Sequence, residues 1–361
     1  MRSSARRPVS FSQACGPLSG PGKPLPVNRT SRVSSFVGDL GMYLGVVVNP
    51  FARKNRGMPA DRSTALRRIV GPWGEVHEID CLDHLRGVVA ALYPRASHLV
   101  SDGGDGALHW LINEMLVCVG DPQCWPVFVP TNGGAIDFVA RKAGVRGRAD
   151  AILRALITAA QANQPPPEVR LDTLELLGET VDGATFHRVG FALAAGGVGN
   201  RFFHKYYEHD DPGRGTIARV IARAVGEYAV SGAGDLFAPT YARVVIDGEE
   251  ISTRKHNALH AGAFDVNLGG VIRIFPRARE AGVLHFQAGE ISPGKIIAHL
   301  PALVAGGAIR GDRLRDVSGR EMVIEAENEP LSPIVDGERF PDIVRLTVRA
   351  GPRIRIAQPR G

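Results

Sequence analysis

The sequence predicts an α/β domain built on a parallel sheet, followed by a second domain that is a β-sandwich. The chain has 361 residues, which is more than one ordinary hydrophobic core holds. From residue 42 onward, short apolar runs alternate with helical patterns, as in a parallel sheet covered by helices. Three consecutive prolines at 165–167 end this alternation, and strand patterns dominate beyond them. We therefore expect the α/β domain to span 42–165 and the β-sandwich to span 166–361.

Strands and helices are expected to alternate along the first domain. Each strand is a short apolar run, and each helix has apolar residues three and four positions apart. The expected strands are 43–48, 74–80, 97–100 and 125–130. The expected helices are 60–70, 82–93, 107–119, 135–144 and 149–163. Asp61 is expected to begin the first of these helices, and Gly144 to close the fourth.

The second domain is read mainly as strands. A long stretch of strand character, with a Val-Asp-Gly turn at 181–183, opens it. The strand patterns cover 171–197, 240–252, 263–276, 282–289, 321–329 and 343–350. Helical interruptions are expected near 203–230 and 292–305. Many short strands with few helices predict a sandwich or barrel, and we expect the sandwich.

Residues 1–41 are expected to be a disordered basic tail. The first 38 residues hold six Lys or Arg and no Asp or Glu, and are rich in Ser, Pro and Gly. The remainder has 37 basic and 37 acidic residues, so the formal charge of +6 belongs to the tail. We therefore expect no nucleic-acid partner. The tail lacks the apolar core of a secretory signal; it reads either as a transit peptide or, as we prefer, as sequence preceding a true start at Met42.

Composition also bounds the compartment. No run approaches the roughly 18 to 20 apolar residues of a membrane-spanning helix, so lipid contact is expected to be peripheral. The four cysteines show neither metal-binding spacing nor a disulfide framework, which favours a reducing compartment. These are Cys15, Cys81, Cys118 and Cys124. We expect a cytoplasmic protein with peripheral membrane association.

Polar or glycine-rich loops follow three of the expected strands of the first domain. In such a sheet the carboxyl ends of the strands form the ligand crevice, and free N–H groups at a helix start favour an anion. Glycines there let the backbone approach a ligand closely. The loops therefore predict a nucleotide-binding crevice. Its candidate residues are Asn49, Pro50, Lys54, Gly103, Gly104, Asp105, Gly106, Gly133 and Gly134.

Two of these side chains have open interpretations. The carboxylate of Asp105 would repel phosphate, unless a divalent cation intervenes or the carboxylate binds a nucleotide hydroxyl. Alternatively, Asp105 caps the helix in a tight turn. Lys54 either reaches a phosphate or is a solvated loop lysine.

The ordered set of motifs from Met42 to Pro359 resembles the diacylglycerol kinase catalytic-domain family of lipid kinases, which is similar to sphingosine and ceramide kinases. The Asn-Pro turn at 49–50, the Gly-Gly-Asp-Gly run at 103–106 and the segment "GGAIDFVARKAG" carry the resemblance in the first domain. In the second domain "LAAGGVGNRF", "FPRAREAGVLHF" and "EPLSPIVDGERF" carry it.

The resemblance implies an ATP-dependent kinase that transfers the γ-phosphoryl group to a lipid hydroxyl, diacylglycerol-like or sphingoid-like, with Mg²⁺. It implies that ATP and the lipid meet between an N-terminal nucleotide-binding domain and a C-terminal lipid domain at a membrane surface. Asp105 and its glycines would hold nucleotide. Asp336 would accept the hydroxyl proton, and Glu338 would be its partner or a metal contact. No metal ligand set, lipid identity or oligomeric state follows from the motifs.

Asp336 has a competing interpretation, because Asp-Gly pairs often form hairpin turns. A second Asp-Gly-Glu run begins at Asp247, and nothing local distinguishes the two. Asp336 is preferred because it lies near the C-terminus after "EPL", where the resembling family has its own Asp-Gly-Glu. His256 and His260 lie four residues apart, but the stretch reads as strand or loop, so we expect no metal site there.

Several positions depart from the family pattern and motivate alternative functions. In one register of the resemblance, Asp137 stands where Asn is usual and would place a negative charge near phosphate; in another register Asp137-Phe138 matches the family's Asp-Phe, with Val139 inserted. The other departures are Ala107, His109, Trp110, Ala135 and Ala281. One alternative is therefore a degenerate relative that binds nucleotide or lipid without turnover. Another is a NAD kinase, which shares the Gly-Gly-Asp-Gly loop; the terminal Asp-Gly-Glu and the lack of a dinucleotide motif argue against it.

Overall fold

The computed structural model describes residues 41–56, 61–209, 212–232, 234–268, 272–305, 307, 310–311 and 313–359. Apart from Gly41, the expected tail lies outside these residues, and so does Cys15. The chain divides into two compact units. The first contains the chain up to Leu171 together with its end from Arg353, and the second contains Asp172–Pro352.

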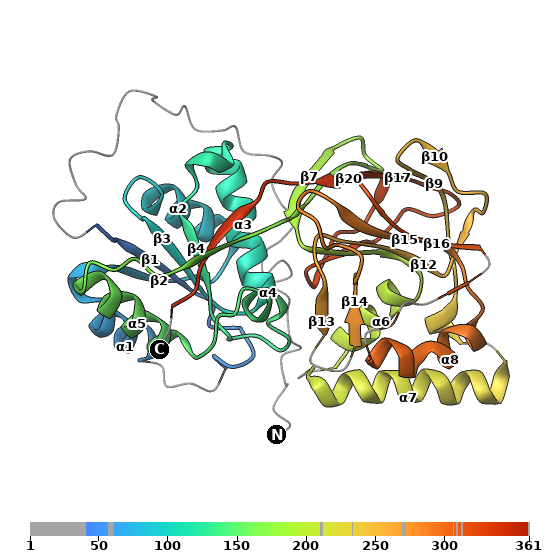
Figure 1. The fold of residues 1–361 in the computed structure, drawn as a ribbon, viewed down its shortest axis with the longest axis horizontal. Helices are drawn as coiled ribbons and strands as arrows, with labels where there is room; N and C mark the ends of the chain where they lie inside the picture. Colours follow the sequence, from blue (N-terminus) through green and yellow to red (C-terminus); the bar gives the residue numbers. More distant parts are fainter. Residues whose placement is uncertain are drawn as a thin grey trace, which may run out of the picture. The chain divides into compact units, whose positions relative to one another are not determined.

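The first unit is built on a six-stranded sheet with the order β2-β1-β3-β4-β21-β5 (Figure 1). Neighbouring strands from β2 to β21 pair in parallel, and β5 pairs antiparallel to β21 at the edge. The strands are β1 (Leu44–Val48), β2 (Gly74–Glu78), β3 (His98–Asp102), β4 (Val127–Pro130), β5 (Glu168–Leu171) and β21 (Ile354–Ala357). β1, β3 and β4 are buried along their whole length, as expected for parallel strands covered on both faces.

Helices cover this sheet in two layers. α1 packs beside α5, and α2 packs beside α3. In α5 one apolar stripe of Ile152, Leu153 and Leu156 faces inward, whereas α3 is buried on all sides over 108–115. The helices are α1 (Arg62–Val70), α2 (Leu82–Leu92), α3 (Asp105–Val119), α4 (Phe138–Lys142) and α5 (Ala149–Gln161). Single 3₁₀ turns lie at Gly71–Trp73 and Pro122–Cys124.

The division of the chain differs from the expected boundary after residue 165. β5 follows the three prolines but still belongs to the first sheet, and so does the last strand, β21. β21 lies between β4 and β5, with Ile354, Ile356 and Ala357 buried. The first unit is therefore discontinuous in sequence, and the expectation that 166–361 forms one domain does not describe these contacts.

The second unit contains two larger antiparallel sheets, in agreement with the predicted fold class. The first sheet has the order β10-β9-β17-β20-β6-β7, with β11 paired to β9. Its strands are β6 (Leu174–Thr180), β7 (Thr185–Gly190), β9 (Thr240–Ile246), β10 (Glu249–Glu250), β11 (Lys255–His256), β17 (Glu321–Ala326) and β20 (Ile343–Ala350). In β9 the buried Ala242, Val244 and Ile246 alternate with more exposed residues, so this sheet has one buried face.

The second sheet of this unit has the order β16-β15-β12-β8-β18-β19. Its strands are β8 (Ala192–Gly196), β12 (Ala258–Gly262), β15 (Leu284–Glu290), β16 (Arg313–Gly319), β18 (Ile334–Val335) and β19 (Glu338–Arg339). A separate pair joins β13 (Val266–Leu268) to β14 (Ile272–Ile274). β12 is buried throughout, and α6 contacts both β12 and β8, so this sheet is covered on both faces.

The described residues of the second unit include the helices α6 (Gly197–Tyr207), α7 (Arg214–Ser231) and α8 (Pro293–Val304), with a 3₁₀ turn at Asp235–Phe237. Leu236, Phe237, Ile291 and Ile296 form a small core among them, with Ala224 of α7. The two helical interruptions expected near 203–230 and 292–305 correspond to these elements, except that α6 begins directly after β8.

Candidate functional site

The candidate site of the first unit lies where β1, β3 and β4 end. The chain leaves β1 toward β2 on one side and leaves β3 toward β4 on the other, so the sheet reverses its winding between β1 and β3. Loops at such a reversal, at the carboxyl ends of the strands, form the ligand crevice of open α/β sheets. The structure therefore brings the three predicted loops to the position at which this fold class binds its ligands.

Backbone hydrogen bonds tie the three loops together. The N–H of Asn49 donates to the carbonyl of Asp102 at 3.0 Å, and the N–H of Lys54 donates to Gly133 at 2.9 Å. Gly133 in turn donates to the carbonyl of Gly103 at 3.0 Å. Across Pro50, the side-chain oxygen of Asn49 accepts the N–H of Phe51 at 2.9 Å, which makes a local turn.

The glycines are required because two loops touch each other. A Cβ on Gly104 would lie 2.7 Å from the Cα of Gly134, and one on Gly133 would lie 2.8 Å from the carbonyl oxygen of Gly103. No larger residue fits such distances without a shift of the backbone. The sequence analysis attributed these glycines to the approach of a ligand. The structure gives them a second cause, the packing of the 103–104 loop against the 133–134 loop.

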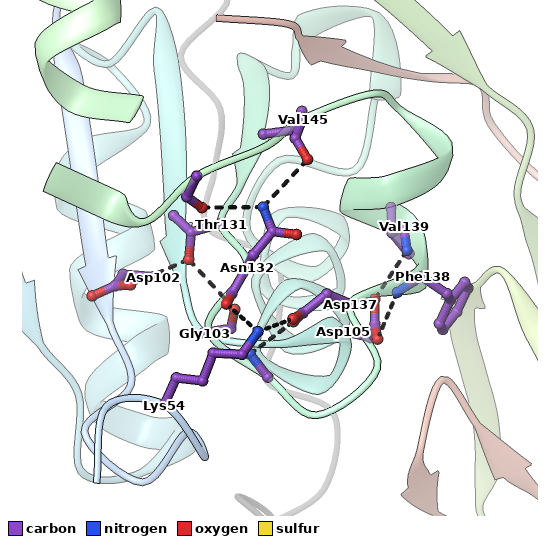
Figure 2. A network of polar contacts seen from close by, with 12 residues as sticks. Lys54, Asp102, Gly103, Asp105, Thr131, Asn132, Asp137, Phe138, Val139 and Val145 are labelled. Atoms are coloured by element: carbon purple, nitrogen blue, oxygen red, sulfur yellow. Dashed lines mark hydrogen bonds and ion pairs between the residues drawn. The ribbon is translucent and has the colours of Figure 1, made fainter. Parts of the chain in front are cut away.

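The carboxylate of Asp105 caps a helix, but not its own. Asp105 is the first residue of α3, and its oxygens accept the N–H groups of Phe138 at 3.1 Å and Val139 at 3.0 Å, at the start of α4 (Figure 2). The capping interpretation therefore describes the observed contacts, with α4 in the place of α3. Gly106 follows in the first turn of α3.

Lys54 forms an ion pair with Asp137. Its Nζ lies 2.7 Å from Oδ2 of Asp137 and donates to the carbonyl of Asn132, also at 2.7 Å (Figure 2). The other carboxylate oxygen, Oδ1, accepts the N–H of Gly134 at 2.7 Å. The negative charge that the sequence analysis expected near phosphate is thus compensated by the lysine expected to bind phosphate.

A buried charge that the sequence did not predict lies at the end of β3. Asp102 is bound by the Arg62 guanidinium through Nη2, at 2.7 Å to Oδ2 and 2.9 Å to Oδ1, and by the hydroxyl of Thr131 at 3.2 Å. Burial raises the pKa of Asp102, and hydrogen bonds and the charge of Arg62 oppose this rise. Asn55 donates to the carbonyls of Asn49 and Asp102, at 2.9 and 3.0 Å.

A signal for this cluster was present in the sequence. Asp102 directly precedes the glycines at a strand end, where ligands of this fold class bind, and Arg62 opens the helix after the first loop. Two of the departures from the family pattern have a simpler account. His109 and Trp110 are buried core residues of α3 whose rings meet edge to face at 5.4 Å.

Asp336 and Glu338, the predicted catalytic pair, belong to the second unit. Asp336 and Gly337 form the two-residue turn between β18 and β19, with φ values of 52° and 96°. Two positive φ values in a two-residue loop indicate a type I′ hairpin turn, so the hairpin interpretation is correct for the backbone. Glu338 begins β19 and is buried.

The carboxylate of Asp336 holds a strand junction. Oδ1 accepts the N–H groups of Phe191 and Ala192, each at 2.9 Å, and Oδ2 accepts that of Phe191 at 3.1 Å. Phe191 separates β7 from β8, where the chain passes from one sheet of the unit to the other. The side chain of Asp336 therefore fixes the point at which the chain passes between the two sheets. A catalytic role for Asp336 would be additional to this structural role.

The second Asp-Gly-Glu run uses its aspartate in the same manner. Asp247 and Gly248 have φ values of 49° and 83° between β9 and β10. Oδ1 of Asp247 accepts the N–H groups of Arg320 and Glu321 at 2.9 and 2.8 Å. The difference is burial, because Asp247 is exposed and Asp336 is buried.

The glycine-rich start of α6 satisfies its backbone internally. Gly197 donates to the hydroxyl of Thr240 at 3.0 Å, Val198 to the carbonyl of Asn257 at 2.8 Å, and Gly199 to Nε2 of His260 at 3.2 Å. Burial lowers the pKa of His260 to about 4, which keeps Nε2 an acceptor. Within the described part of the chain, no three His, Cys, Asp or Glu side chains gather as they would around a metal ion.

Ala281 is exposed in the turn before β15. None of the three described cysteines, Cys81, Cys118 and Cys124, forms a disulfide. Among the described helices, none combines the length and the apolar character needed to cross a bilayer.

Comparison with known proteins relates the chain to lipid kinases by fold. No protein-family profile matches it, and no curated protein matches its sequence. Three solved chains of Bacillus anthracis strain Sterne, described as diacylglycerol kinases (two of them provisionally), share its fold. Their TM-scores are 0.61, 0.60 and 0.55, at 12%, 14% and 12% identity. Each alignment covers 88% of this chain and 97% of the other, so the likeness extends over both units.

Proposed function

We propose that the protein is an ATP-dependent kinase that transfers the γ-phosphoryl group to a lipid hydroxyl, diacylglycerol-like or sphingoid-like. The observation that carries the proposal is the shared fold, which spans 97% of chains described as diacylglycerol kinases. Fold alone does not determine function, so the proposal also depends on the residues of the strand-end loops. The lipid would be met at a membrane surface by a cytoplasmic protein.

The loops supply the groups that a nucleotide needs. The start of α3 provides backbone N–H groups and the positive end of a helix dipole, and both favour phosphate. Lys54 provides a cation at the same loops, and Arg62 with Asn55 anchors them to the end of β3. Phosphoryl transfer requires mainly positioning and charge neutralisation, for which a loop region held this firmly is suitable.

Mg²⁺ is proposed to arrive with the nucleotide. It is usually held by one or two carboxylates together with substrate phosphates and water, so a protein cage is not required. Asp105 is the loop carboxylate proposed to contact the ion, although in the structure Asp105 caps α4. When bound, the ion would neutralise phosphate charge.

Asp336 is proposed to accept the proton of the lipid hydroxyl, with Glu338 beside it. A carboxylate can accept a proton late in phosphoryl transfer. The backbone N–H bonds from Phe191 and Ala192 would hold the Asp336 carboxylate in one orientation.

A second candidate function is nucleotide binding without turnover. The pairing of Lys54 with Asp137 favours it, because the loop cation already has an anionic partner. The structural use of Asp105 and Asp336 favours it as well, since both carboxylates hold backbone groups.

The test is phosphoryl transfer from labelled ATP with Mg²⁺ to a panel of lipid alcohols in mixed micelles. We expect labelled phospholipid from the full chain, and its loss in Asp336→Asn and Asp105→Ala. Asp247→Asn is the matched control, because it alters the equivalent turn in the exposed hairpin. Melting of each variant is recorded alongside, so that unfolding is not mistaken for lost catalysis.

The alternatives give different results in the same experiment. A ligand at about 100 times its dissociation constant stabilises by roughly 2.7 kcal/mol, which a melting curve resolves. An ATP-dependent melting shift without any transfer supports the binding function. If the protein neither transfers phosphate to any lipid nor shows a melting shift with ATP, both the kinase function and the binding function are excluded.

A further inference from the structure

The carboxylate of Asp137 is enclosed by the loops that it holds. Its side chain has no exposed surface, and its two oxygens bind Lys54 and the N–H of Gly134. A buried carboxylate is costly unless it is paired and hydrogen-bonded. The ammonium of Lys54 is therefore the group that compensates the charge of Asp137.

Lys54 is held less tightly than its partner. The side chain of Lys54 is 45% exposed, whereas its backbone N–H is fixed on the carbonyl of Gly133. Lysine carries its charge on a flexible four-carbon stem, so the ammonium can move while the loop stays in place. The same ammonium is the loop cation available to an incoming phosphate.

We propose that Asp137 is an internal anion that competes with nucleotide phosphates for Lys54 and thereby sets the phosphate affinity of the loops. The inference rests on the proposed nucleotide site. A phosphate that draws the Lys54 ammonium away would leave Asp137 buried without its cation, and one that binds Lys54 in place would meet the negative charge of Asp137. The Asp137 carboxylate therefore lowers the affinity of the site for the phosphate groups of a nucleotide and leaves its affinity for the nucleoside unchanged.

Asp137→Asn is the variant that isolates this effect. An asparagine side-chain oxygen still accepts the N–H of Gly134, and asparagine tolerates the left-handed backbone of this position, where φ is 55°. The substitution removes the charge, and it places an amide NH2 group opposite the ammonium of Lys54 in place of the acceptor Oδ2. Asp150→Asn is the matched control, since Asp150 is an exposed residue of α5 and its replacement changes the net charge equally.

The experiment is calorimetric titration of the full-length wild type, Asp137→Asn and Asp150→Asn with adenosine, AMP, ATP and inorganic tripolyphosphate at constant Mg²⁺. We expect Asp137→Asn to bind ATP and tripolyphosphate about tenfold more tightly, because close charge pairs contribute at least this much. Adenosine affinity should not change, and Asp150→Asn should match the wild type.

Three results would overturn the inference. They are equal ATP affinity in the wild type and Asp137→Asn, a gain of the same size for adenosine, and a gain of the same size in Asp150→Asn. In each of these cases the nucleotide site itself stands. If no variant binds any nucleotide at millimolar concentration, the proposed function fails together with the inference.

A second measurement does not depend on nucleotide. Lys54→Met leaves Asp137 buried without its cation, so we expect it to lower the melting temperature. Adding Asp137→Asn to Lys54→Met should restore most of the loss. If the two substitutions are additive instead, Lys54 does not compensate Asp137, and the competition cannot operate.

Discussion

Gly104 and Gly134 lie back to back, and a Cβ on Gly134 would be 2.5 Å from the Cα of Gly104. Two loops that are 30 residues apart in sequence thus share a contact that only hydrogen atoms can fill. Both loops begin at the carboxyl ends of neighbouring strands, β3 and β4, so the sheet itself brings them together.

We expect Gly134→Ala to destabilise the first unit by about 1–3 kcal/mol, the usual cost of forcing extra atoms into a packed region. The three tryptophans, Trp73, Trp110 and Trp125, all belong to this unit, so their fluorescence in a denaturant titration reports on it selectively. Gly87→Ala in α2 is the control. Its Cβ would meet nothing within 4 Å, and it should stabilise by up to about 1 kcal/mol. Equal effects of the two substitutions would contradict the close-contact account.

The pair of Arg62 and Asp102 gives a second prediction. Arg62→Met leaves a buried carboxylate without its cation, and such losses cost about 3–5 kcal/mol. Asp102→Asn in the same chain should recover a large part, which a double-mutant cycle by tryptophan fluorescence measures. Replacement of Arg223, the exposed partner of Glu227, is the control and should have no measurable effect on the free energy of unfolding. A coupling energy near zero for Arg62 and Asp102 would show that the pair is not what stabilises this strand end.

Stability should fall in mild acid because of two buried histidines. Burial lowers the pKa of His98, in the first unit, and of His260, in the second, from 6.5 to about 4. Between pH 6.5 and 4 these two histidines are therefore protonated in the unfolded chain but neutral in the folded chain. The contribution of the two histidines to stability is complete above pH 6.5 and is lost as the pH falls toward 4. Each pKa unit corresponds to about 1.4 kcal/mol. Unfolding followed by tryptophan fluorescence should show the His98 effect, and His98→Gln should flatten the profile; an unchanged slope would contradict it.

The two Asp-Gly turns should respond differently to the same substitution. Asp336→Ala leaves the N–H groups of Phe191 and Ala192 without their acceptor in a buried position, at a cost of about 1–3 kcal/mol for each unsatisfied group. Asp247→Ala exposes its N–H partners to water, which replaces the lost acceptor, so the effect should be small. Tyrosine fluorescence and circular dichroism can follow the second unit, which has no tryptophan. Equal destabilisation would mean that the burial of Asp336 is unimportant.

Removal of residues 353–361 should destabilise the first unit, although these residues lie at the far end of the sequence. β21 separates β4 from β5, so its loss leaves β4 without a neighbour on that side and detaches β5. Ile356→Ala is a milder form of the test, and the loss of a fully buried isoleucine should cost about 2–5 kcal/mol. A truncated chain with an unchanged tryptophan transition would contradict the role of β21.

Much of the first unit could be predicted from sequence because its strands and helices have strong local patterns. The strands expected at 43–48, 74–80, 97–100 and 125–130 correspond to β1 to β4, and the glycine loops follow them as expected. β21 could not be assigned in this way. Its four residues, Ile354–Ala357, are too few to show a clear period, and no local feature indicates which sheet they join.

The contacts within the site could not be predicted either, because they join residues that are far apart in the sequence. Lys54 and Asp137 are 83 residues apart, and Arg62 and Asp102 are 40 apart. The sequence alone therefore does not indicate which cation pairs with Asp137 or with Asp102. For Asp336 the local part could be predicted, because the Asp-Gly pair indicates a hairpin turn. Its hydrogen bonds to Phe191 and Ala192 could not, because these residues are 145 and 144 positions away.

The late position of β21 has a consequence for biosynthesis. When the chain has been synthesised as far as Leu171, β1 to β4 and β5 exist, but the strand that joins β5 to β4 does not. The first unit therefore cannot close its sheet until β21 has been synthesised, whereas Asp172–Pro352 is whole by then. Nascent chains stalled before residue 353 would expose the side of β4 to other strands, and this makes the interval a point at which a chaperone is expected to act.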